Sequence, residues 1–277
     1  SGDPAAISAQ RWRLARRGLL LFAFGYFLDW VWPGTILFFY GALFVLAAVL
    51  FTLGTRWLAA IGIAAALAAA ALQWWNLDHN LSWLLEGRSE YTLSPRDLLF
   101  DVAVRGTHPL LPWLAFLCLG MVLARQMPWK MERQVMIAFA GVLMVAGSYA
   151  VAGNLPWHSS LQTTHPFDRG LLYIVSTVGS TLVAIVVVNA LANRFRDAAP
   201  TRWLATAGRT TLSLYLLHVA VFNLVVDWLG WLDRGAGLGT ALLLALLFWV
   251  AAVALANAWS RYRPVGPAEW LYRRLSD

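Results

Sequence analysis

The stretch from Gly235 to Arg261, which reads GAGLGTALLLALLFWVAAVALANAWSR, decides the fold class of this sequence. It carries no charged side chain before Arg261, and leucine, alanine and valine make up most of it. About 20 apolar residues in a helix are enough to cross the hydrocarbon core of a bilayer. Because lipid offers backbone N–H and C=O groups no partner, such a segment must pair them internally. The stretch therefore predicts a transmembrane helix.

Other parts of the sequence repeat this pattern. Of the 277 residues, 60% are hydrophobic and 13% are charged, which excludes an ordinary soluble domain. We predict an all-α, polytopic bundle that forms a single membrane domain over residues 1–277. Its extracytoplasmic loops are predicted at 76–108 and 154–169. About eight spans are expected, at approximately 17–32, 35–53, 57–75, 109–126, 133–153, 170–194, 203–231 and 235–261.

The distribution of basic residues predicts the orientation. Fifteen of the 21 Lys and Arg residues fall on the side that holds the N-terminal segment, and five fall on the other side. Basic residues accumulate on the cytoplasmic side of membrane proteins, so both termini are predicted to be cytoplasmic. The net charge of +7 therefore reflects orientation and contact with membrane lipids, not nucleic-acid binding.

Two further segments suggest surface helices. Residues 94–97, Ser-Pro-Arg-Asp, are typical of the start of a short interfacial helix. Residues 266–277 predict an amphipathic helix with Trp270 and Leu271 toward the lipid. The chain begins Ser1-Gly2-Asp3-Pro4, without Met, and we interpret it as a fragment or a processed chain.

Histidines and acids concentrate on the predicted extracytoplasmic side. This side holds nine of the 14 acids, with Asp29, Asp168 and Asp227 among them. Two interpretations stay open: polar loops that happen to contain these residues, or a pocket with a general base. No metal site is expected, because the histidine spacing lacks the regularity that presents two ligands to one ion. The four histidines on this side are His79, His108, His158 and His165.

The span predicted at 203–231 contains the most informative residues. Ionisable side chains inside a span are costly, so Arg209 and His218 should face the bundle interior or a water-filled cavity. Arg209 either reaches the cytoplasmic headgroups or binds an anionic donor. His218 either forms an interhelical hydrogen bond or acts in catalysis or proton transfer. Tyr215, three residues earlier, shares its helical face, whereas Asp227 lies on roughly the opposite side.

Several motifs resemble those of a known group of membrane enzymes. Residues 208–218, GRTTLSLYLLH, resemble the "Gly, basic, x-x-Leu-x-x-Tyr-Leu-x-His" span of integral membrane acyltransferases. Residues 106–121, GTHPLLPWLAFLCLGM, resemble a span of bacterial proteins like heparan-alpha-glucosaminide N-acetyltransferase. Residues 16–37 are similar to the early helix and turn of those proteins. Residues 266–273, GPAEWLYR, resemble the tail of their YeiB-like relatives.

The resemblance implies a bundle of about ten or eleven helices that moves an acyl group from a cytoplasmic thioester to an acceptor outside. The first helices of the family, with an "Asp-x-x-Arg-Gly" motif and the histidine usually given the catalytic role, have no counterpart here. The donor would be acetyl-CoA or another acyl-CoA, with no metal. The acceptor would be a hydroxyl or amine of an envelope glycan or glycolipid.

On this hypothesis the candidate catalytic residues are His108, His165 and His218. Arg209 would bind the donor phosphate, and Asp168 and Arg169 would lie beside the acceptor. Further binding candidates are Tyr215, Asp227 and Asp29.

Other functions also fit the sequence. The chain could be a carrier or permease, with Arg209, His218 and Asp227 lining a path. It could also be a non-catalytic subunit that works with a partner membrane chain, or it could form a homodimer.

Overall fold

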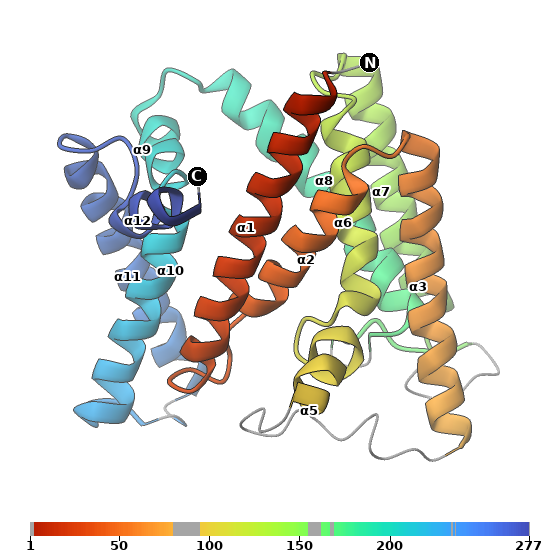
Figure 1. Ribbon diagram of the computed structural model, residues 1–277, viewed down its shortest axis with the longest axis horizontal. Coiled ribbons are helices and arrows are strands. Elements are labelled where there is room, and N and C mark those ends of the chain that lie inside the picture. The colour runs from red at the N-terminus through yellow and green to blue at the C-terminus, as the bar shows by residue number, and fades with distance from the viewer. Residues whose placement is uncertain are drawn as a thin grey trace. The chain divides into compact units, whose positions relative to one another are not determined.

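The computed structural model describes residues 3–79, 95–154, 162–166, 169–233, 235 and 237–276. Every regular element within these ranges is a helix, which confirms the all-α class (Figure 1). The chain divides into two compact units, Ser1–Asn189 and Ala190–Asp277. The single membrane domain stays a prediction.

Helices α1 (Pro4–Asp29) and α2 (Leu37–Leu50) form a closely packed pair in the first unit. The start of α1 lies well before the predicted position 17. Asp3 caps the helix by accepting a hydrogen bond from the Ala5 N–H at 3.0 Å, and Pro4 occupies the first turn, where its missing N–H costs nothing. The arginine-rich segment that follows is therefore helical.

The remaining long helices of this unit are α3 (Thr55–Asp78), α6 (Leu110–Ala124), α7 (Met131–Val151) and most of α8 (Leu171–Arg194), which continues past Asn189. Helices α3 and α6 pack together. Helices α7 and α8 approach closely at Gly141 and Gly179, because a Cβ built on either glycine would lie 2.6 Å from the other's carbonyl oxygen. This fits the small-residue packing expected between membrane helices.

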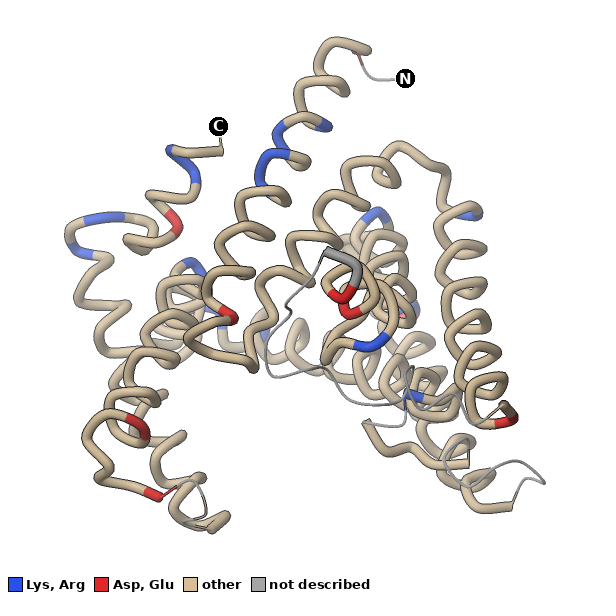
Figure 2. Tube along the Cα trace, turned by 60° about the horizontal axis from the view of Figure 1, so that its bottom comes forward, with Lys and Arg blue, Asp and Glu red and all other residues tan. Residues whose placement is uncertain are grey.

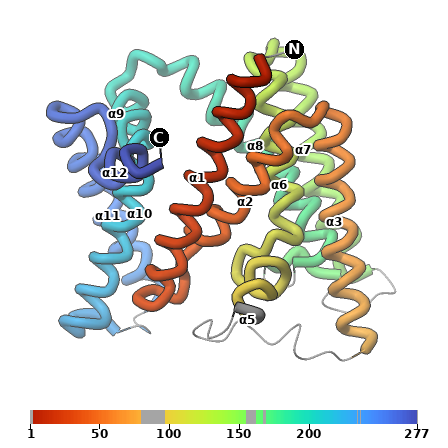
Figure 3. The backbone as a smooth tube through the Cα atoms, in the orientation of Figure 1, coloured from red at the N-terminus to blue at the C-terminus, as the bar shows by residue number. Residues whose placement is uncertain are grey.

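A break precedes α6. The short helix α5 (Pro95–Phe100) continues into a π-helical turn, η1 (Asp101–Arg105), and the chain then bends by 54° into α6 (Figure 3). The short helix predicted from residues 94–97 is therefore present. Its packing places Val102 against Phe38 and Phe39 of α2, which are both fully buried.

The second unit contains α9 (Ala199–Ala207), α10 (Thr211–Phe222), the π-helical segment η3 (Asn223–Trp228), α11 (Gly237–Ser260) and α12 (Pro267–Ser276). Its small core consists of Ala207, Leu214, Ala252 and Ala256. The surface helix predicted at the C-terminus is present as α12.

The prediction of one continuous span over 203–231 is wrong. Helix α9 ends at Ala207, and α10 begins at Thr211. Thr210 lies between them in a non-helical conformation, and its hydroxyl donates to the Ala207 carbonyl at 2.9 Å, which satisfies an acceptor at the end of α9.

Five helices among the described residues are long and apolar enough to cross a membrane. A sixth span results if the bent pair of α5–η1 and α6 counts as one, and α2 is apolar but shorter. The chain is thus a multi-pass membrane protein, whereas the count of eight spans and the orientation stay predictions. The five candidate spans are Thr55–Asp78, Met131–Val151, Leu171–Arg194, Thr211–Trp228 and Gly237–Ser260.

Candidate functional site

The break between η1 and α6 gathers charged residues (Figure 2). The Arg105 guanidinium binds the Asp101 carboxylate at 3.1 Å and the Asp97 carboxylate at 3.3 Å. Asp101 is only 1% exposed, so its ion pair with Arg105 is largely shielded from solvent. We use the name break site for Asp97, Asp101, Arg105, His108 and Arg169.

Arg169 joins the break site from the segment before α8. Its Nη1 donates to the carbonyl oxygens of Val104 at 3.4 Å and Arg105 at 3.1 Å, which caps the end of η1. The guanidinium also lies 5.9 Å from the ring centre of Trp113. Burial lowers the pKa of Arg169 from its ordinary value, which Tyr173 partly opposes. The backbone φ of Arg169 is 51°, a left-handed conformation that is uncommon outside glycine.

His108 lies in the connection at the break, outside the five candidate spans. Its ring packs between those of Phe39 and Trp113, with centroid distances of 6.0 and 5.3 Å. Burial, and then the positive charge of Arg169, lower the pKa of His108 from its ordinary value of 6.5. The lowered pKa favours the neutral imidazole, the form that can accept a proton.

The other predicted extracytoplasmic residues have different surroundings. His165 is exposed and lines a separate shallow hollow at the end of α7, with Tyr149 and Gly153 among its neighbours. Asp29, in the last turn of α1, is only 2% exposed. Asp168 and His158 lie outside the described residues.

Asn76, near the end of α3, is a buried polar residue that the sequence interpretation missed. It is fully buried, and neither of its side-chain polar atoms has a hydrogen-bond partner in the part of the chain that the structure describes. An unsatisfied buried amide lowers stability. A lone asparagine near the end of an apolar run gave no signal for it.

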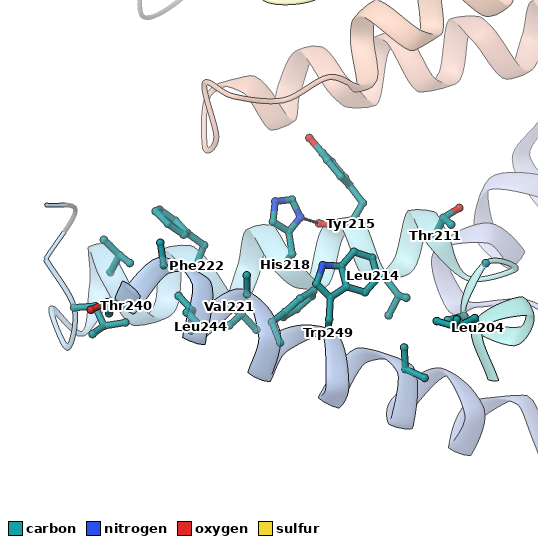
Figure 4. A pocket seen from close by; sticks show the side chains of 18 of the residues that line it. Leu204, Thr211, Leu214, Tyr215, His218, Val221, Phe222, Thr240, Leu244 and Trp249 are labelled. Carbon is teal, nitrogen blue, oxygen red and sulfur yellow. Dashed lines mark hydrogen bonds between the residues drawn. The ribbon is translucent and has the colours of Figure 1, made fainter. Parts of the chain in front are cut away.

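The second unit contains a cavity of about 730 Å³ between α10 and α11 (Figure 4). We call it the α10 cavity. Leucine, alanine, valine and aromatic side chains form most of its wall, with Leu214 and Leu244 on opposite helices. The polar side chains that line it are those of Thr211, Tyr215, His218, Asp233 and Thr240.

His218 is the one histidine in the wall of the α10 cavity. Its Nδ1 lies 2.5 Å from the carbonyl oxygen of Tyr215, one turn earlier. A carbonyl oxygen can only accept, so Nδ1 is the donor in this bond, and in the matching neutral tautomer Nε2 is the nitrogen that can accept a proton. The ring also lies 5.0 Å from that of Tyr215 and 6.3 Å from that of Phe248 on α11. Tyr215 and His218 line one cavity, which agrees with their predicted shared face.

Two other predicted residues of this region lie outside the cavity wall. Arg209 is exposed in the turn between α9 and α10, so its predicted position inside a span is wrong. The neighbouring Gly208 does line the cavity, which leaves Arg209 beside its rim. Asp227, in η3, is exposed, and the acid in the wall is Asp233 instead.

The motif at residues 208–218 contacts the motif at residues 266–273. One Glu269 carboxylate oxygen accepts the backbone N–H groups of Leu212 at 2.6 Å and Ser213 at 3.1 Å, and the other accepts the Ser213 hydroxyl. The Ser213 oxygen in turn accepts the Ala268 N–H at 3.0 Å. Glu269 of α12 thus caps the N-terminus of α10, a role that the sequence interpretation missed.

The helices and the two sites define a multi-pass helical membrane protein with a charged break in one unit and an apolar cavity in the other. Residues 120–277 match the family described as Protein of unknown function (DUF418), and the chain belongs to this family. The match covers the α10 cavity and Glu269, and it begins after the break between η1 and α6. No curated protein and no solved structure matches the chain.

Proposed function

We propose that this chain is an integral membrane acyltransferase of the YeiB-like group. It would transfer an acyl group from a cytoplasmic acyl-CoA, such as acetyl-CoA, to a hydroxyl or amine of an extracytoplasmic glycan or glycolipid. The bacterial inner membrane is the proposed location. The observation that carries the proposal is the α10 cavity, an apolar space with one imidazole in its wall.

The cavity suits an acyl group because its wall is mostly apolar. In the transfer, the acceptor oxygen or nitrogen bonds to the acyl carbon while the C–S bond of the thioester breaks. The acceptor proton passes to Nε2 of His218, and the departing thiolate is protonated to free thiol. The hydrogen bond of Nδ1 to Tyr215 supports this role, since it fixes the tautomer in which Nε2 is basic.

Arg209 would bind the phosphates of the donor. Guanidinium groups bind phosphate through two parallel hydrogen bonds, and Arg209 is exposed beside the cavity rim. In the predicted orientation this rim faces the cytoplasm, where acyl-CoA is found.

Thioester turnover tests the proposal. The purified chain in lipid nanodiscs is supplied with labelled acetyl-CoA or octanoyl-CoA and a glycolipid extract, and free thiol and acylated lipid are measured. We expect His218→Gln to abolish turnover, with His79→Gln as the matched control. Arg209→Ala should weaken donor binding by about tenfold to a hundredfold, since a hydrogen bond to a charged group is lost. Arg202→Ala, an exposed arginine of α9, should bind the donor normally.

The 54° bend before α6 favours a second candidate function, a carrier, because transporters use broken helices at their binding sites. Free thiol distinguishes the two. A folded protein that relocates a labelled lipid or solute and leaves the thioester intact would be a carrier, and the acyltransferase proposal would then be wrong.

A further inference from the structure

Helix α12 has the composition of an interfacial helix. Gly266 precedes the helix, and Pro267 is its first residue. Glu269 lies in the first turn, whereas Arg273 and Arg274 lie in the last turn, so the charges complement the helix dipole. Both arginines are exposed, as are the apolar side chains of Trp270 and Leu271, which are 44% and 51% exposed. Charged and apolar side chains on one exposed helix are typical of contact with a lipid surface.

The membrane-spanning helices of the same unit indicate the level at which α12 lies. The candidate span of α10 begins at Thr211, and Glu269 of α12 binds the next two residues. The candidate span of α11 ends at Ser260, one residue before Arg261. The ends of both spans therefore place α12 at the boundary between hydrocarbon and headgroups.

This boundary region is basic. Arg261 and Arg263 are exposed in the connection that leads to α12, where the Trp259 indole donates to the Val265 carbonyl at 2.9 Å. Within residues 260–276 the single acid is Glu269. Its carboxylate binds the N-terminus of α10, and the four arginines of these residues outnumber it.

We propose that α12, together with Arg261 and Arg263, is a docking surface for anionic phospholipid headgroups, and that Glu269 couples this docking to the N-terminus of α10. Arginine pairs well with lipid phosphate, and each basic residue near an anionic leaflet contributes to binding. The apolar side chains that would enter the hydrocarbon are Trp270, Leu271 and Leu275. Free phosphate has no hydrocarbon for them, so the proposed ligand is a phospholipid. The inference does not depend on acyl transfer.

The coupling has a direct readout. The N–H groups in the first turn of a helix have no partner within that helix. The N–H groups of Leu212 and Ser213 donate to Glu269 instead, so their exchange with solvent reports whether α12 is docked. The same turn contributes Thr211 to the α10 cavity, and Tyr215 follows within one further turn. Lipid bound at α12 would therefore order the mouth of the cavity.

Hydrogen exchange of the whole chain in nanodiscs tests the proposal. We compare phosphatidylglycerol with phosphatidylcholine and follow residues 211–213 and 270–276. Exchange should slow on the anionic lipid by about fivefold for each arginine engaged. Equal exchange in the two lipids would overturn the proposal. So would equal protection by inorganic phosphate added to phosphatidylcholine nanodiscs, because the ligand would then be free phosphate.

Paired variants separate docking from coupling. Arg273→Gln with Arg274→Gln should remove the lipid dependence, whereas Arg194→Gln with Arg196→Gln, an equal charge change elsewhere, should keep it. Glu269→Ala tests the coupling, because it removes the acceptor oxygens: α12 should still respond to anionic lipid, while residues 212 and 213 should not. A lipid response of these two residues that persists in Glu269→Ala would overturn the coupling.

Discussion

The break site and the α10 cavity differ in what occupies them: charged side chains in the first, and empty apolar space in the second. In the break site, charged groups bind one another: Arg105 pairs with Asp97 and Asp101, and Arg169 caps the end of η1. In the α10 cavity, apolar walls enclose space, and His218 is held by its own helix. A site filled with its own ion pairs gains order and precise orientation. A hollow apolar site has room for a ligand, and this difference is the reason why we assign the proposed acyl transfer to the second unit.

The ion pair of Asp101 and Arg105 gives the largest expected effect. Asp101→Ala leaves Arg105, whose side chain is 18% exposed, without its buried partner. We expect a loss of about 3 kcal/mol in the free energy of unfolding. Thermal unfolding in detergent measures it. The matched control is Asp97→Ala, which removes a carboxylate that is 46% exposed and should cost about 1 kcal/mol or less. Equal costs for both variants would contradict a break site that depends on a buried pair.

Filling the α10 cavity is the next test. Ala245 lines the cavity, and Ala245→Phe places a ring where an acyl chain would lie. If the ring keeps two methylene groups of the acyl chain out of the cavity, their burial is lost, and we expect the affinity for octanoyl-CoA to fall by about tenfold. Equilibrium binding to nanodiscs measures this. Ala251→Phe is the control, because Ala251 is exposed on the same helix and does not line the cavity. An unchanged affinity in Ala245→Phe would place the acyl chain elsewhere.

The smallest expected effect concerns His108 and pH. The pKa of His108 is below its ordinary value of 6.5 in the folded protein, so the unfolded chain takes up a proton at a higher pH. The free energy of unfolding should therefore fall as the pH drops below 6.5, and it should level off once the folded ring is also protonated. Melting temperatures on both sides of this pH measure the slope. His108→Gln should flatten it, and an unchanged slope would contradict burial of the ring. His165→Gln is the matched control.

Sequence patterns predicted the helices well because lipid leaves the backbone few alternatives. The apolar run of Gly237–Ser260 is one uninterrupted helix, as expected. The break at Arg209 escaped prediction, since hydropathy averages over Gly208–Thr210 and does not detect a local change of backbone conformation. The shared wall of Tyr215 and His218 was predictable because helical periodicity alone determines it.

Contacts between distant segments were beyond the reach of the sequence. Ser213 and Glu269 belong to the two motifs that the sequence analysis identified at residues 208–218 and 266–273. The spacing of these motifs along the chain does not predict that they are in contact. Arg169 was a candidate beside the acceptor, whereas its bonds to the carbonyls of Val104 and Arg105 depend on the tertiary fold. The Asp101–Arg105 pair lies four residues apart, and its spacing could have revealed it.

The tight join between α12 and α10 limits how the C-terminal segment can evolve. A Cβ at Gly266 would collide with the Ser213 side chain and the Glu269 carboxylate, so a side chain there must displace this carboxylate from Ser213 or shift α12. By contrast, Arg261, Tyr262 and Arg263 are exposed. A saturation mutagenesis library of the tail should therefore accept many exchanges at those three positions and reject nearly all at position 266. The smallest residue of the tail would then be its least replaceable one.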